Sequence, residues 1–158
     1  MIRKAVVDDT SVIFRFICEL AEFENAADQV ETSIEQLRET VFGPKSVVDA
    51  LIYELDGKPV AFALWYFTFS TWQGRPGLYL EDLYVTPEAR GRGIGTEILK
   101  HLARHALENG FGRFEWSVLD WNTPAIRTYD ATGAKPQSEW IRYRLAGDEL
   151  ESFAKGSV

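Results

Sequence analysis

Apolar residues recur at helical spacing in two stretches near the start of the chain. The first stripe has intervals of one, three, one and three residues and comprises Val12, Ile13, Phe16, Ile17 and Leu20. A β-branched segment over residues 2–7 precedes it and predicts a strand, and Asp8, Asp9 and Thr10 offer oxygens for a helix N-cap. A second helix is predicted from the capping-box spacing Thr32-x-x-Glu35 to Gly43-Pro44.

The middle of the chain has the pattern of strands. Segments 47–55 and 59–69 flank Asp56-Gly57, a hairpin turn signal, so we expect an antiparallel pair. Both alternating sets of side chains in the second segment are apolar, which predicts that both faces of the sheet are covered. A loop over 70–77 and a further strand over 78–85 follow.

The last part alternates helices and strands. An amphipathic helix is predicted over 94–107, closed by Asn109-Gly110, and a strand over 113–119. A short helix begins at Thr123-Pro124 and ends at Gly133, and segment 140–145 is predicted as the final strand. The resulting order, β-α-α-β-β-β-α-β-α-β, indicates an α/β (α+β) mixed sheet with helices on both faces.

Length and charge restrict the class of protein. The 158 residues suit a single domain spanning 1–158, with 46% hydrophobic and 26% charged residues. Lys and Arg number 17 against 24 Asp and Glu, a net charge of −7, which argues against nucleic acid or an anionic membrane as the main partner. The one cysteine, Cys18, allows no intrachain disulfide, and no apolar run has the length of a membrane span. We therefore expect a soluble, cytoplasmic protein.

A glycine- and arginine-rich turn between the strand over 78–85 and the helix over 94–107 is the most informative feature. Glycines there would let successive N–H groups at the helix start face one anion, and the basic residues nearby are Arg90, Arg92, Lys100 and Arg104. This pattern suggests a phosphate-bearing ligand, and the alternative is a plain turn with solvated arginines. The spacing fits neither G-x-G-x-x-G nor G-K-[ST], so Rossmann and P-loop readings are disfavoured.

Arg90-x-x-Gly93-x-Gly95 resembles the acetyl-CoA-binding motif R/Q-x-x-G-x-G/A of the GCN5-related N-acetyltransferases (GNAT). The resemblance extends over residues 2–145 to the diamine acetyltransferases, which act on spermidine, spermine or thialysine. It is carried by Phe67–Gly74, by Tyr79–Val85, by Leu119-Asp-Trp-Asn122 and by Tyr129. Ser70-Thr-Trp72 is closer to the thialysine branch, because the polyamine branch tends to have an acidic residue where Ser70 stands.

The resemblance implies a mostly antiparallel sheet with a splayed parallel strand pair, between which acetyl-CoA binds. It implies that the backbone of Leu83, Tyr84 and Val85 holds the pantetheine arm. The other cofactor-binding residues that it implies are Arg90, Gly91, Arg92, Gly93, Ile94, Gly95 and Thr96 for the pyrophosphate, with Asn122, Pro124 and Ala125. Asn122 could otherwise be only a helix cap.

Two residues are the catalytic candidates. Glu81 and Asp82 are adjacent acids inside an apolar strand, where an unpaired carboxylate is costly. An amine acceptor with a lysine-like pKa of ~10.4 must lose a proton before it attacks. The resemblance gives this role to Glu81, through water, and makes Asp82 an acceptor ligand or a structural acid. It also implies that Tyr129 protonates the departing thiolate, although helical spacing alone would make Tyr129 a core residue.

The candidate acceptor site is acidic and aromatic. Between residues 19 and 39 there are seven acids and one base, a negative region that would attract a cation or merely form a solvated face. The resemblance assigns acceptor contacts to Phe23 and Glu24, and Trp72 and Trp121 could pack an aliphatic amine or belong to the core. With Glu81 and Asp82 these complete the predicted substrate-binding set.

Other chemistry has weaker support. His101 and His105 are one helical turn apart, but no acidic or cysteine partner lies at ligand spacing, so we expect no metal. Cys18 reads as a packed residue, which fits direct transfer without an acyl-enzyme. The predicted function is acetyl transfer from acetyl-CoA to a small primary amine, and the resemblance implies a homodimer. The alternatives are a catalytically silent CoA-binding module and a protein or peptide N-acetyltransferase.

Overall fold

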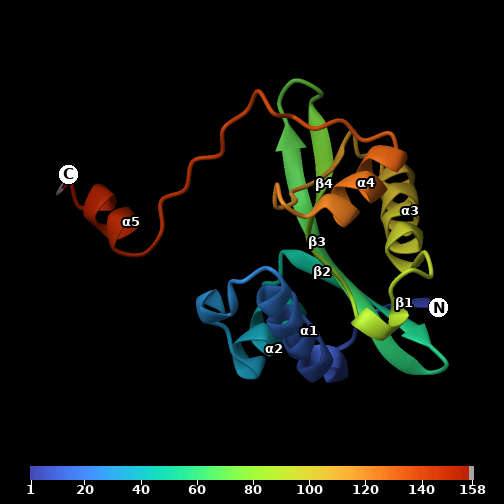
Figure 1. Cartoon of the computed structure of the whole chain (residues 1–158). Coiled ribbons are helices and arrows are strands. Elements are labelled where there is room, and N and C mark those ends of the chain that lie inside the picture. Colours follow the sequence, from blue (N-terminus) through green and yellow to red (C-terminus); the bar gives the residue numbers. More distant parts are fainter. Residues whose placement is uncertain (157–158) are drawn as a thin grey trace. The chain divides into compact units, whose positions relative to one another are not determined.

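The computed structural model describes residues 1–156, which form two compact units joined between Asn122 and Thr123 (Figure 1). The first unit contains the sheet and the helices α1 (Thr10–Phe23), α2 (Ile34–Phe42) and α3 (Ile94–Glu108). The second contains α4 (Thr123–Ala131) and α5 (Gly147–Ala154). Among residues 1–156, every helix falls short of the length and apolar character that crossing a membrane requires.

The sheet of the first unit is mixed, as predicted. Its five strands lie in the order of the sequence: β1 (Ile2–Lys4), β2 (Val48–Leu55), β3 (Lys58–Ser70), β4 (Arg75–Val85) and β5 (Phe114–Trp116). The first three pairings are antiparallel, and β4 with β5 is parallel. Asp56 and Gly57 have φ of 52° and 74°, the two positive values of a type I′ hairpin turn, which confirms the predicted turn between β2 and β3.

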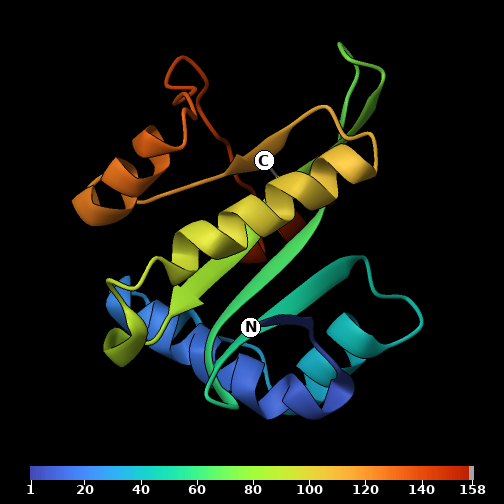
Figure 2. The same ribbon diagram turned by 90° about the vertical axis from the view of Figure 1, so that its right-hand side faces the viewer.

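Helices cover both faces of this sheet (Figures 1 and 2). On one face, Phe16 of α1 stacks on Phe62 of β3 with ring centroids 5.8 Å apart, and both side chains are fully buried. On the other face, α3 buries Ile98 and Leu102, and the His105 ring meets the edge of Trp65. This two-sided burial explains why both alternating sets of β3 are apolar.

Three short 3-10 turns join these elements: η1 (Val7–Asp9), η2 (Ala27–Gln29) and η3 (Pro87–Ala89). The first shortens the predicted opening strand to residues 2–4, because Val7 already belongs to η1. The third leads from β4 into the glycine-rich segment before α3.

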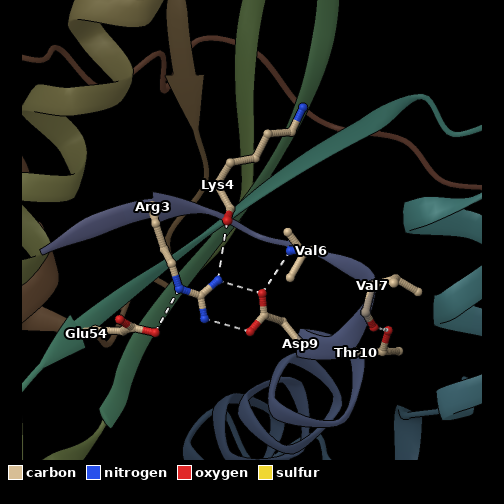
Figure 3. Close-up of polar contacts among 7 residues, drawn as sticks. All are labelled: Arg3, Lys4, Val6, Val7, Asp9, Thr10 and Glu54. Carbon is tan, nitrogen blue, oxygen red and sulfur yellow. Dashed lines mark hydrogen bonds and ion pairs between the residues drawn. The ribbon is translucent and has the colours of Figure 1, made fainter. Parts of the chain in front are cut away.

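An ion-pair network fixes the N-terminal strand to the start of α1 (Figure 3). Arg3 donates two hydrogen bonds to the Asp9 carboxylate, at 2.7 and 2.8 Å, and its Nε donates to Glu54 at 2.7 Å. The Val6 N–H also donates to Asp9 at 2.8 Å. These donors, the Arg3 guanidinium first, hold the pKa of Asp9 below its ordinary value.

Two predicted helix caps differ in the structure. Asp9 is the N-cap residue of α1, but its side chain makes no capping bond, because its carboxylate is engaged by Arg3 and Val6. At α2 the cap is Ser33, not Thr32: the Ser33 hydroxyl accepts a 3.1 Å hydrogen bond from the Gln36 N–H. The capping-box spacing therefore located the start of α2 to within one residue.

The predicted last strand over 140–145 is wrong, since no strand occurs between α4 and the end of the described chain. Its large side chains are exposed, with Trp140 at 68%, Ile141 at 78% and Tyr143 at 90%. A period-two pattern shows which side chains alternate, but it supplies no neighbouring strand to hydrogen-bond. Helix α5 follows instead, with Asp148 and Glu149 in its first turn, where acids favour a helix.

Candidate active site

Glu81 lies at a β-bulge. In the ladder between β3 and β4, Leu64 is opposite Asp82 and Trp65 is opposite Leu80, so Glu81 has no partner. A bulge re-aims the extra residue and interrupts the alternation of side chains. The Glu81 side chain is accordingly exposed, while Leu80 is buried and Asp82 partly buried.

The parallel pairing of β4 with β5 stops immediately before this bulge. Its last pair is Leu80 with Trp116, so from Glu81 to Val85 only β3 accompanies β4. The Thr86 N–H donates to the Val60 carbonyl of β3 at 2.9 Å, and by alternation Leu83 and Val85 turn their backbone groups away from β3. The predicted splay of the parallel pair is confirmed, and it leaves the edge at Leu83 and Val85 facing the side from which β5 has departed.

Three carboxylates from two elements lie near one another. Burial, and after it the charges of Glu81 and Glu24, raise the pKa of Asp82 to about 6. Burial also raises the pKa of Glu24, which directly follows α1. A bound cation would stabilise the charged forms of such crowded carboxylates.

Aromatic side chains adjoin these acids. Phe23, the last residue of α1, lies 5.8 Å from Trp121 between ring centroids. Of the predicted acceptor residues, the structure brings together Phe23, Glu24, Glu81, Asp82 and Trp121.

Trp72 is placed elsewhere. It lies in the turn between β3 and β4 and is 84% exposed. Arg75, the first residue of β4, is six residues from Glu81, a span of roughly 20 Å along a strand. Ser70, at the end of β3, accepts a 3.2 Å hydrogen bond from the Gln73 N–H and so closes the same turn.

The glycine-rich segment forms an open N-terminus for α3. Gly91 and Gly93 have φ of 74° and 78°, the left-handed region that favours glycine. A side chain built at Gly95 would meet no described atom within 4 Å, so the approach to the first turn is clear. Within residues 1–156, no side chain caps this helix at Gly93. Its first N–H groups therefore remain available to an anion, and they fit the pyrophosphate of coenzyme A.

Glu97 is the acidic residue in the first turn of α3, and its charge would oppose a bound phosphate. Its carboxylate accepts a 2.8 Å hydrogen bond from the Tyr53 hydroxyl on β2. This bond holds the charge toward the sheet.

Arg90 and Tyr84 have contacts that the sequence did not indicate. Arg90 Nε donates to the Val85 carbonyl at 3.0 Å, and the guanidinium lies over the Phe23 ring at 5.1 Å and the Tyr84 ring at 5.7 Å. Burial and the Glu19 carboxylate raise the pKa of Tyr84 to about 12, so its hydroxyl stays protonated. Glu19 was missed, although Phe16, Glu19 and Phe23 follow helical spacing and lie on one side of α1.

The remaining predicted site residues lie close in sequence to the division between the two units, which falls after Asn122. Asn122 closes a turn at the end of the first unit, where its N–H donates to Leu119 at 2.9 Å. Pro124, Ala125 and Tyr129 belong to α4 in the second unit, with Ala125 and Tyr129 one turn apart on the same side of the helix.

Comparison with known proteins decides the family. The sequence model of the acetyltransferase (GNAT) family matches residues 14–134. The chain belongs to the GNAT family. This acetyltransferase is 41% identical to thialysine N-epsilon-acetyltransferase of Sus scrofa, covering 98% of its own chain and 96% of the relative. It is 34% identical to the protein of the same name from Caenorhabditis elegans, over 93% of its chain and 92% of the relative.

Solved structures show the same fold. An integron cassette protein of V. cholerae has a TM-score of 0.80 to the acetyltransferase at 27% identity, covering 98% and 97% of the two chains. The family resemblance, the fold class and the N-acetyltransferase activity expected from the sequence are thereby confirmed.

Proposed function

We propose that this enzyme transfers the acetyl group of acetyl-CoA directly to a primary amine of a small diamine or amino acid, with thialysine-like molecules as first candidates. The observation that carries the proposal is the gathering of Glu24, Glu81 and Asp82 beside Phe23 and Trp121, where β5 leaves β4. Carboxylates next to aromatic faces suit an ammonium on an aliphatic chain. The names of the thialysine relatives support the acceptor class.

The proposed cofactor-binding residues lie at the open edge of β4 and at the N-terminus of α3. The backbone of Leu83, Tyr84 and Val85 would hold the pantetheine arm, with Asn122, Pro124 and Ala125. The pyrophosphate would bind the glycine-rich segment and the first turn of α3, through Gly91, Arg92, Gly93, Ile94, Gly95 and Thr96. Arg90 belongs to the same segment, although its side chain faces Phe23.

Two residues of this chain transfer protons in the acetyl-transfer reaction, Glu81 as acceptor and Tyr129 as donor. Bound acetyl-CoA supplies a thioester, so the amine nitrogen forms a bond to the acetyl carbon as the carbon–sulfur bond breaks. Glu81 takes the ammonium proton through a water molecule, while Asp82 and Glu24 hold the ammonium end of the acceptor. The nitrogen loses its second proton as the amide forms, and this proton passes to solvent. Tyr129 gives its proton to the thiolate, and the phenol takes a proton back from solvent.

The test is thiol release from acetyl-CoA with thialysine, lysine, ornithine, spermidine, spermine and a lysine peptide. We expect thialysine or another amino acid to be preferred, with Glu81→Gln and Tyr129→Phe each lowering kcat at least tenfold. In both variants the affinity for acetyl-CoA, measured by calorimetry, should change less than twofold.

Each other outcome contradicts one part of the proposal. A preference for spermidine would contradict the thialysine-type acceptor, and a preference for the peptide would indicate a protein N-acetyltransferase. Binding of acetyl-CoA without thiol release to any amine would indicate a CoA-binding module. Equal loss of affinity and turnover in Glu81→Gln would refute its role as base.

We further propose one catalytic domain over 1–158, because the family match over residues 14–134 crosses from the first compact unit into the second. A homodimer is proposed as well, with segment 140–145 in its interface, where Trp140, Ile141 and Tyr143 are exposed. Charge substitutions at Ile141 and Tyr143 should give a monomer by light scattering. The net charge of −7 supports a small cationic partner rather than nucleic acid or a membrane. We also propose that the enzyme acts in the cytoplasm.

A further inference from the structure

Arg90 is held in place by the end of β4. It directly follows η3, with the extended backbone values φ −64° and ψ 161°, and its Nε donates to Val85 at 3.0 Å. A planar guanidinium anchored through Nε has a fixed orientation, which a lysine in its place would lack. Its cationic face is presented to Phe23, at 5.1 Å, and to Tyr84, at 5.7 Å.

Phe23 links the Arg90 contact to the acidic residues of the site. It ends α1, and the chain turns sharply after it, since Asn25 has a φ of 57°. Phe23 is 40% exposed and also meets Trp121. Glu24 follows it directly, and the Glu24 charge acts on Asp82. Phe23 and Glu24 are thus neighbours at the end of α1.

Arg90 contacts the acceptor side through a ring and not through an ion pair. Within residues 1–156 it forms no ion pair with a carboxylate, and the groups that shift the pKa of Asp82 are carboxylates and burial. The contact with Phe23 is thus its connection to the acceptor side. On its other side, Arg90 is continuous with Gly91 and Gly93, whose backbone leads into the first turn of α3.

We propose that Arg90 is a positioning residue that couples the cofactor-binding segment 90–96 to the acceptor-binding end of α1. This inference rests on the proposed function. Binding of the pyrophosphate fixes the segment, the fixed Arg90 holds Phe23 against Trp121, and Glu24 is thereby ordered for the ammonium. Acetyl-CoA and the acceptor amine then favour each other's binding, because both select the same arrangement of Arg90 and Phe23.

The kinetic test compares Arg90→Met with Arg92→Met. Both remove one positive charge from the same segment, and methionine preserves part of the arginine stem. We expect Arg90→Met to raise the KM for thialysine three- to tenfold, while the Kd for CoA in the absence of the amine, measured by calorimetry, changes less than twofold. Arg92→Met should weaken the binding of CoA and leave the KM for thialysine nearly unchanged. Arg90→Lys should behave like Arg90→Met, because it keeps the charge but loses the anchored plane.

The structural test needs no turnover. Addition of CoA should slow amide hydrogen exchange in residues 20–26 of the wild-type chain, and Arg90→Met should lose this protection while still binding CoA by calorimetry. Protection retained in Arg90→Met, or none in the wild type, would overturn the coupling. So would a rise in the acetyl-CoA KM alone. Absence of turnover with every amine would instead refute the proposed function, and hydrogen exchange would still decide on Arg90.

Discussion

The Tyr53 hydroxyl donates a 2.8 Å hydrogen bond to Glu97, and this bond ties strand β2 to the first turn of α3. The two residues are far apart in sequence, and neither belongs to the cofactor motif. The bond determines the electrostatics of that motif, because it directs an acidic side chain at the helix N-terminus toward the sheet.

Removing this bond should weaken the binding of acetyl-CoA. In Tyr53→Phe the Glu97 carboxylate is free to turn toward the helix start, where it repels a phosphate. We expect the Kd for CoA, measured by calorimetry, to rise about two- to fivefold. The double variant Tyr53→Phe/Glu97→Gln should recover the wild-type Kd. If it binds as poorly as Tyr53→Phe, the effect comes from altered packing and not from charge.

The charged form of Asp82 should lower the free energy of unfolding near neutral pH. Because its folded-state pKa is raised from 3.8 to about 6, its protonated form is favoured by folding. That favourable contribution is complete below pH 4 and is lost as the pH rises through about 6. Asp82→Asn should therefore raise the free energy of unfolding at pH 7.5 by about 1–3 kcal/mol and leave it nearly unchanged at pH 4.

The same variant should impair acceptor binding. We expect the KM for the amine to rise at least tenfold in Asp82→Asn, and the wild-type KM to rise as the pH falls below about 6. Thermal unfolding at the two pH values and steady-state kinetics provide the measurements. A less stable Asp82→Asn protein at pH 7.5 would contradict the assignment of Asp82 as a destabilising buried acid.

Asp9 should have the opposite dependence on pH. Its pKa lies below the ordinary 3.8 because Arg3 and the Val6 N–H stabilise its charged form. The stabilisation is present above pH 4 and is lost as the pH falls through the folded-state pKa. Asp9→Asn should lower the free energy of unfolding at pH 7 by about 1–3 kcal/mol, since it weakens charge-assisted bonds to a partly buried arginine.

Asp49→Asn is the matched control for Asp9→Asn. Asp49 pairs with Lys4 at 3.2 Å, and the Lys4 side chain is 78% exposed. Such a pair contributes about 0–1 kcal/mol, so urea unfolding should show little change. If both variants lose the same free energy of unfolding, the Arg3 network stabilises the fold no more than an exposed ion pair does.

Gly93 should be required for the cofactor and not only for the fold. Its φ of 78° makes Gly93→Ala cost about 1–2 kcal/mol in stability, and the altered turn displaces the N–H groups that face the pyrophosphate. Gly110, after α3, has a φ of 70° and equally open surroundings. Gly110→Ala should therefore lose similar stability in urea unfolding. A tenfold or greater rise in the Kd for CoA is expected only in Gly93→Ala.

Patterns of neighbouring residues located most elements and the cofactor segment. The hairpin at Asp56 and Gly57, the stripes of α1 and α3 and the strand before Arg90 depend on local backbone preference and on side-chain periodicity, which a single sequence displays. Segment 140–145 has the same kind of periodicity. It failed as a strand because pairing requires a second segment at the right place.

The bulge at Glu81 is a feature that the sequence alone could not show. Two adjacent acids in an apolar strand indicated a functional site, but the extra residue of the bulge was identified only by the register of β4 against β3. The same register turns Leu83 and Val85 toward the open edge. Register is a relation between two strands, and neither strand contains it alone.

The sequence by itself determined the family, the order of helices and strands from β1 to α4 and the residue types of the candidate site. Tertiary structure decided that Glu24 lies near Asp82, that Arg90 faces Phe23 and that Trp72 lies apart from them. The reason is physical: helix and turn signals act over a few residues, whereas burial, charge–charge interaction and ring contacts depend on distances between segments far apart in the chain.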